Sequence, residues 1–224
     1  GGSFRADRLE SIPVPSGGPV NLTWLEERLG RASREGERVM VALQAANNET
    51  GVIQPVCEAA SLVRAAGGVL HCDAVQAAGK VHLSMDGLGA DTLALSAHKI
   101  GGPQGVGALV VSSRVHIAEP LLRGGGQERG SRAGTENVPG IAGFGAAARV
   151  AVEALAAEEP RILALRDRLE AGLLAVAPEA VVFGRGDRPL PNTTPFALPG
   201  WRAEPAILAP HMAAVPAPAG SACP

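Results

Sequence analysis

Lys99 is the residue of this sequence whose type and position most directly suggest covalent chemistry. It follows the apolar run 92–95 and precedes a glycine-rich stretch, 101–105. A lysine at the end of a buried strand, facing a loop with little side-chain bulk, is easily desolvated and can form an imine with a carbonyl cofactor. A lone lysine at a strand end is more often an ordinary solvated residue. The chemical interpretation therefore depends on the residues that accompany Lys99.

Polar residues near two predicted strand ends complete the set for a pyridoxal 5'-phosphate (PLP) site. Asp73 ends one apolar run, and Gln76 follows three positions later. PLP requires a lysine for its aldehyde, an acid that keeps its pyridine nitrogen protonated, and donors that bind its phosphate. Lys99 supplies the amine and Asp73 supplies the acid. Ser96 and His98, which precede Lys99, are the candidate phosphate donors.

The order of apolar runs predicts an α/β fold in which these residues share one edge of a sheet. We expect strands over 39–45, 69–73 and 92–95, with a helix over 55–66 connecting the first two. Strand–helix–strand units build parallel sheets, and ligands gather at the carboxyl ends of such strands. Asn48 follows the first strand and so reaches the same edge, although an Asn-Asn pair by itself more often marks a plain turn.

The rest of the chain predicts further elements without visible chemistry. Asn21 or Thr23 caps a helix that runs to about Ala32. The run 106–111 is expected to be antiparallel because its connection from Lys99 is short. Additional helices are expected over 139–157, 160–176 and 204–213, with strands over 180–183 and 194–198. The second of these helices carries an apolar stripe that predicts core packing, formed by Ile162, Leu165, Leu169, Leu173 and Val176.

Residues 121–132 are the part of the sequence richest in glycine and arginine. Bare glycines let backbone N–H groups converge on an anion, and arginines add positive charge, which favours a phosphate neighbour. A flexible surface loop explains the same composition equally well. The sequence leaves both interpretations open.

The composition indicates a globular protein. With 224 residues, 46% hydrophobic content and a mean hydropathy of +0.14, the chain can bury a sizeable core. A formal charge of −2 gives no concentrated positive field of the kind that nucleic acids and anionic membranes attract. The sequence also contains no run of about 18 uncharged apolar residues. We therefore expect neither a nucleic-acid partner nor a membrane partner.

The three cysteines, Cys57, Cys72 and Cys223, have neither paired nor metal-ligand spacing. This argues against a disulfide framework and against a zinc site, and it is consistent with a protein of the reducing cytoplasm. Cys223 lies among small residues, 216–224, where a thiol is accessible and able to move. On spacing alone it is more often incidental than nucleophilic, because sequence does not give its thiolate fraction.

Six separated blocks carry recognisable motifs, in this order: A-N-N-E-T-G at 46–51, H-C-D-A-V-Q at 71–76, S-A-H-K-I at 96–100, G-G-G-Q-E-R at 124–129, R-A-G-T-E-N at 132–137 and G-S-A-C at 220–223. Together they resemble the cysteine desulfurases and selenocysteine lyases, PLP enzymes of the class V aminotransferase type. The resemblance implies a mostly parallel sheet with flanking helices and part of a smaller α+β domain. We expect a large PLP-binding domain over 1–145 and a small domain over 146–224, each incomplete.

The resemblance also implies a role for each matching residue around the cofactor. Asn48 and Gln76 would lie near its phenolic oxygen, and Ser96 would bind its phosphate. His98 would share that phosphate site and count among the catalytic residues. Thr135 would reach across a dimer interface to the partner subunit's cofactor phosphate, which implies a homodimer.

The implied activity is that of a cysteine desulfurase. Lys99 would hold PLP as an internal imine and act as acid and base on the substrate, while Asp73 keeps the ring an electron sink. Cys223 would attack the sulfur of L-cysteine, leaving L-alanine and a persulfide for an acceptor protein, as in iron–sulfur cluster assembly. A lyase of L-selenocysteine and a folded interaction module without cofactor are the alternatives. The 224-residue chain alone is expected to be inactive.

Overall fold

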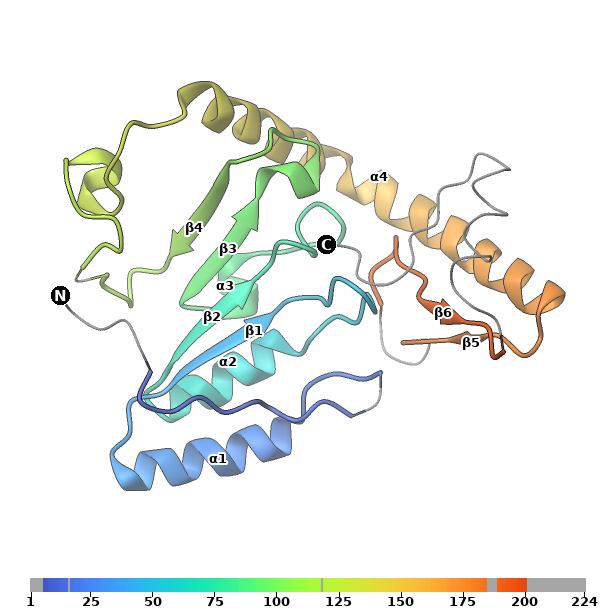
Figure 1. Ribbon diagram of the computed structural model, residues 1–224, viewed down its shortest axis with the longest axis horizontal. Helices are drawn as coiled ribbons and strands as arrows, with labels where there is room; N and C mark the ends of the chain where they lie inside the picture. The colour runs from blue at the N-terminus through green and yellow to red at the C-terminus, as the bar shows by residue number, and fades with distance from the viewer. Residues whose placement is uncertain (1–5, 16, 118, 185–188, 201–224) are drawn as a thin grey trace.

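The structure, a computed structural model, describes residues 6–15, 17–117, 119–184 and 189–200 (Figure 1). Its helices are α1 (Leu22–Glu35), α2 (Val56–Ala65), α3 (Met85–Leu88) and α4 (Val138–Val176), with 3-10 turns η1 (Ala97–Ile100) and η2 (Gln127–Gly130). Its strands are β1 (Met40–Gln44), β2 (Val69–Asp73), β3 (Thr92–Ser96), β4 (Gly107–Val111), β5 (Val181–Val182) and β6 (Phe196–Ala197). The helix expected over 204–213 lies outside the described residues.

The larger sheet has the strand order β1-β2-β3-β4. β1, β2 and β3 run parallel, and β4 pairs with β3 in the antiparallel direction. The sheet confirms the predicted α/β class and the antiparallel direction of the run 106–111. All four strands begin and end within one residue of their predicted limits, because each apolar run is bounded by glycine or polar residues that end the ladder.

The smaller sheet consists of β5 and β6, which pair antiparallel beside the end of α4 (Figure 1). Both strands are shorter than the runs 180–183 and 194–198 that predicted them. α4 connects the two sheets without interruption, so the expected division between residues 145 and 146 lies inside a helix. That division stays a prediction.

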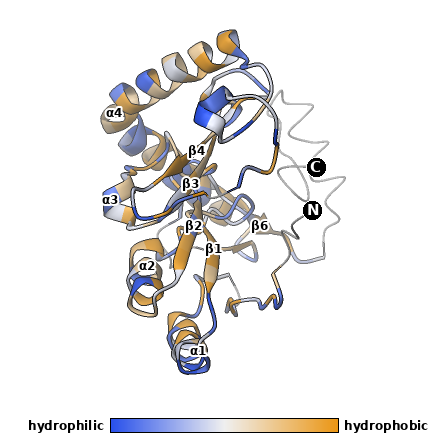
Figure 2. Cartoon of the chain, turned by 90° about the vertical axis from the view of Figure 1, so that its left-hand side faces the viewer, coloured by the Kyte–Doolittle hydropathy of each residue, from blue (hydrophilic) through white to orange (hydrophobic). Residues whose placement is uncertain are grey.

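One face of the larger sheet is buried under α2, which Figure 2 shows beside β1 and β2, and α1 packs on α2 near the edge of the sheet formed by β1. Leu70 and Cys72 of β2, with relative exposures of 0%, alternate inward as a half-buried strand requires. The opposite face is more open, with Met40 66% and Leu109 53% exposed. All five residues of β4 are exposed, so within the described chain its side chains lack a covering layer.

Helix α1 begins and ends at identifiable caps. The Asn21 side chain accepts a hydrogen bond from the Trp24 N–H at 2.9 Å, so Asn21 rather than Thr23 is the N-cap. The helix continues past Ala32 to Glu35, and Gly36 ends it with φ of 68°, a left-handed conformation that glycine adopts without a Cβ clash.

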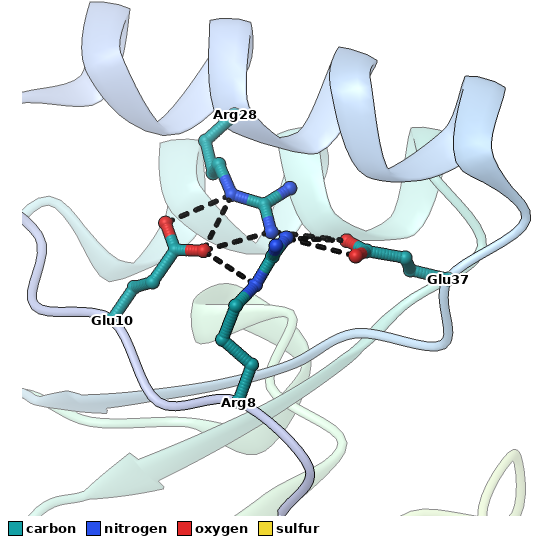
Figure 3. A network of polar contacts seen from close by, with 4 residues as sticks. All are labelled: Arg8, Glu10, Arg28 and Glu37. Carbon is teal, nitrogen blue, oxygen red and sulfur yellow. Dashed lines mark hydrogen bonds and ion pairs between the residues drawn. The ribbon is translucent and has the colours of Figure 1, made fainter.

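Two arginines and two glutamates join the entry segment to α1 (Figure 3). Arg28 of α1 contacts Glu10 at 2.9 Å and Glu37 at 3.0 Å. Arg8 contacts the same two carboxylates, each at 2.8 Å. The Arg28 side chain is only 15% exposed, and each carboxylate contacts two arginines. The network therefore holds residues 8–10 along the helix more firmly than an isolated surface pair would.

The helices expected over 139–157 and 160–176 form one helix, so the predicted break at Pro160 is wrong. Proline removes one backbone donor and normally shortens or kinks a helix. Here packing on both sides of Pro160 outweighs that cost. Before it, α4 contacts η1. After it, Arg166 donates to the carbonyl of Leu190 at 3.0 Å.

The apolar stripe on the second half of α4 does not pack in a core, contrary to its prediction. Leu165, Leu169 and Val176 are 45%, 61% and 88% exposed. Figure 1 shows this half of α4 running beyond the four-stranded sheet, so that sheet does not cover these residues. By length and composition alone α4 could cross a membrane. Its first half instead packs closely on the large sheet's loops, since a Cβ at Gly143 would lie 2.6 Å from Pro103.

We predict that Leu70→Ala and Leu169→Ala differ sharply in their effect on stability. Leu70 is fully buried, so its truncation should lower the free energy of unfolding by about 3 kcal/mol. Leu169 is mostly exposed, and its truncation should change that free energy by less than about 0.5 kcal/mol. Urea denaturation of the 224-residue chain measures both. Equal losses would show that α4 packs its stripe in a core after all.

Candidate active site

Backbone hydrogen bonds hold the carboxyl ends of β1, β2 and β3 level with one another. The Ala45 N–H donates to the Asp73 carbonyl at 2.7 Å, and the Ala74 N–H donates to the Ala94 carbonyl at 3.0 Å. The ends of the three strands therefore form one edge of the sheet. Asn48, Gln76 and Lys99 each follow one of these ends by a few residues, as predicted.

The turn after β1 is built by Asn47 and leaves Asn48 available. The Asn47 side-chain oxygen accepts from the N–H groups of Glu49 and Thr50 at 2.9 and 2.8 Å, and from the Thr50 hydroxyl at 3.2 Å. Among the described residues, no hydrogen bond engages the half-buried Asn48 side chain. Asn47 thus shapes the turn, and Asn48 can donate to a ligand.

Residues 189–193 fix this turn from the opposite side. The Leu190 N–H donates to the Gly51 carbonyl at 2.7 Å, and Leu190 is 1% exposed. Gly51 has φ of 70°, and a Cβ there would lie 2.8 Å from Thr193. The turn that presents Asn48 is therefore closed by glycine geometry and by contact with the segment that precedes β6.

Asp73 ends β2 with an exposed carboxylate. One of its oxygens accepts the Val75 N–H at 3.0 Å, which leaves the other available to a ligand. The preceding residue, Cys72, faces the core, where burial and then the charge of Asp73 raise its pKa to about 12. Cys72 is therefore an inert structural thiol, as expected from its strand position.

The end of β3 turns directly into η1, which carries His98 and Lys99. Ala97 is fully buried, and its N–H donates to the Val106 carbonyl at 3.0 Å, which anchors the start of the turn. The Ser96 hydroxyl and the His98 Nδ1 lie 2.8 Å apart. Lys99 is half-buried at this edge of the sheet. The amine, the hydroxyl and the imidazole are thus gathered within one short segment.

Lys80 is a residue of this edge that the sequence reasoning did not select. Its Nζ donates to the Gln76 carbonyl at 2.8 Å and to the Gln76 side-chain oxygen at 3.4 Å. Burial and then the positive charge of Lys99 lower the pKa of Lys80. The sequence does contain one indication of this contact: Lys80 follows Gln76 by four residues, and side chains at that spacing can meet within one turn.

Thr135 is exposed in the loop that joins β4 to α4. In the same loop Glu128 and Arg129 adopt φ of 50° and 57°, which is uncommon for residues with side chains. Arg132 donates to the Gly134 carbonyl at 2.7 Å, which fixes the backbone just before Thr135. No described contact brings Thr135 to the sheet edge, so its role across a dimer interface stays a prediction. Cys223 lies outside the described residues.

Two surface hollows found on the described chain lie along α1, with linings that include Arg31. Neither includes Lys99 or Asp73. The candidate site is therefore defined by the strand ends that carry its residues and not by either of these hollows. No group of three His, Cys, Asp or Glu residues placed to hold a metal occurs in that part of the chain.

Residues 6–224 match the aminotransferase class-V family, so this chain belongs to that family of PLP-dependent enzymes. A cysteine desulfurase of Gluconacetobacter diazotrophicus is 46% identical over 219 residues, which make up 98% of this chain and 53% of that protein. A NifS-like protein from Rickettsia africae has a TM-score of 0.85 at 34% identity, covering 94% of this chain and 57% of its own. The structure of a cysteine desulfurase from Thermococcus onnurineus has a TM-score of 0.81 at 27% identity. The match covers 93% of this chain and 55% of that one. The chain spans about half the length of the curated relatives it matches.

We predict that Asn47→Ala destabilises the chain and that Asn48→Ala does not. Asn47→Ala removes three hydrogen bonds and should lower the free energy of unfolding by about 1–3 kcal/mol. Asn48→Ala removes none of these bonds and should stay within about 0.5 kcal/mol of wild type. Chemical denaturation of the two variants gives the comparison. A large loss for Asn48→Ala would assign that side chain to the turn and not to a ligand.

Proposed function

We propose that the protein containing this chain is a PLP-dependent cysteine desulfurase, which converts L-cysteine to L-alanine and passes the sulfur on as a persulfide. The observation that carries the proposal is the position of Lys99 just past the end of β3, on the sheet edge where β2 ends in Asp73. The names of the relatives support the same activity. Because the chain spans only about half their length, the activity belongs to the whole protein.

The donors of this edge fit PLP. Lys99 is half-buried and offers an amine for the aldehyde. Asp73 is exposed, with one carboxylate oxygen outside the bond to Val75, and suits a protonated pyridine nitrogen. Ser96 and His98 offer a hydroxyl and an imidazole for the phosphate. When bound, PLP supplies an electron sink for the electron pair at the substrate's α-carbon.

The chain's own residues then divide the remaining work. The Lys99 amine would bind the aldehyde of PLP and would take and return the proton at the substrate's α-carbon. Asn48 and Gln76 orient the phenolic side of the cofactor. Asp73 would supply the negative charge that pairs with the protonated ring nitrogen. His98 assists at the phosphate end, where Thr135 of a second copy would join it in a homodimer.

Cys223 is the proposed nucleophile. Its thiolate attacks the substrate sulfur, the bond from that sulfur to the β-carbon breaks, and protonation of the carbon leaves L-alanine. The sulfur remains on Cys223 as a persulfide, which a sulfur-acceptor protein then takes. A reducing compartment, which we propose to be the cytoplasm, preserves such a thiol. The same residues would act on L-selenocysteine, so both substrates are tested.

A chimera tests the proposed function directly. This chain replaces the matched segment of the Gluconacetobacter diazotrophicus desulfurase, and sulfide release from L-cysteine is measured with excess PLP and reductant. We expect turnover in the chimera, none in its Cys223→Ser variant, and retention of the PLP absorbance band in that variant because the thiol does not hold the cofactor.

Asp73→Asn should weaken PLP binding in the chimera by two or more orders of magnitude, because it removes the negative charge that would stabilise the protonated ring nitrogen.

Two controls accompany the chimera. The 224-residue chain alone should release no sulfide, because it supplies only part of the family's length. L-selenocysteine, assayed beside L-cysteine, distinguishes the lyase alternative by its relative rate. A chimera that binds PLP but turns over neither substrate, with the parent enzyme active under the same conditions, would contradict the proposed activity.

A further inference from the structure

The sequence contains two lysines, Lys80 and Lys99, against eighteen arginines. The structure places these two lysines close enough for the charge of Lys99 to lower the pKa of Lys80. The turn before Lys80 also packs directly on η1, since a Cβ at Gly79 would lie 3.1 Å from the Ile100 side chain. Lys80 is therefore part of the same edge as the proposed PLP lysine.

The hydrogen bonds of Lys80 determine which way the Gln76 amide faces. A lysine ammonium only donates, so it can approach a glutamine side chain only at its oxygen. Lys80 does so, at 3.4 Å, while its second and shorter bond, 2.8 Å to the Gln76 carbonyl, fixes the ammonium in place. With the amide oxygen facing Lys80, the amide NH2 group is directed away from it and remains a donor.

We propose that Lys80 is a positioning residue, which holds the Gln76 side chain so that its NH2 group donates to the phenolic side of PLP. This inference rests on the proposed function, because Gln76 has that task only if PLP is bound. Lys80 itself need not touch the cofactor. If Lys80 served only to cap a carbonyl, the contact with the main chain of Gln76 would suffice, and the orientation of the amide would not depend on it.

Nuclear magnetic resonance of the 224-residue chain tests the first half of the proposal without PLP. The variant Lys80→Met keeps the aliphatic stem but removes the donors, and Lys80→Arg keeps donors and charge. We expect the Gln76 side-chain NH2 resonances to show an ordered amide in wild type and Lys80→Arg, and a mobile one in Lys80→Met. The Gln54 amide, whose oxygen accepts the Val20 N–H at 2.9 Å, should stay ordered in all three. An ordered Gln76 amide in Lys80→Met would overturn the proposal.

A double-mutant cycle on the PLP-binding chimera tests the second half. PLP affinity is measured from the visible absorbance of covalently bound cofactor in wild type, Lys80→Met, Gln76→Ala and the double variant. We expect Lys80→Met to weaken binding about tenfold, Lys80→Arg to restore most of it, and Lys80→Met to add nothing once Gln76 is Ala. Thermal unfolding, measured in parallel, shows whether the fold is intact.

The outcomes separate this inference from the proposed function. No PLP bound by the chimera, with the parent enzyme loaded normally, overturns the proposed function and this inference with it. Normal loading with independent, multiplicative effects of Lys80→Met and Gln76→Ala overturns only the inference, because Lys80 would then act without Gln76. Equal affinity in wild type and Lys80→Met overturns it as well.

Discussion

The parallel alignment of β1, β2 and β3 is the constraint on which the candidate site depends. Two backbone hydrogen bonds, from Ala45 to the carbonyl of Asp73 and from Ala74 to the carbonyl of Ala94, continue the ladder past the last strand residues. A shift of any strand by one residue would turn its side chains to the other face. Because Leu70 and Cys72 are fully buried on one face, such a shift is costly, and the edge is fixed by the core.

Close packing of two loops on α4 then positions Lys99 and Lys80 at this edge of the sheet. Gly102 allows η1 to pack on α4, since a Cβ there would lie 3.2 Å from Ala147. Gly79 does the same for the turn that carries Lys80, with Ala151 of α4 3.2 Å from its Cβ position. The small residues of α4 are thus the surface on which two loops of the site are assembled. Half-burial of Lys99 and Lys80 follows from this packing.

The sequence predicted the strands of the larger sheet correctly, because local patterns determine them. It did not predict the course of α4 or the exposure of its residues, which depend on packing between distant parts of the chain. The runs 69–73 and 92–95 predicted β2 and β3 to within one residue, because short apolar runs bounded by polar residues favour strands. The helix break predicted before Pro160 is absent, because contacts on both sides keep α4 continuous. Leu169 looked like a core residue on periodicity alone, yet the helix runs past the sheet. The bond from Lys80 to Gln76 was not predicted, because a spacing of four residues permits such a contact without establishing it.

Lys99, and not Lys80, is proposed to bind PLP covalently. The chain is incubated with PLP, reduced with borohydride and digested, and its lysine-containing peptides are identified by mass spectrometry. The sequence contains only two lysines, so the labelled position can be assigned directly. We expect the pyridoxyl group on Lys99, with Lys80 unmodified at low PLP concentration. A label on Lys80, or equal labelling of both lysines, would contradict it.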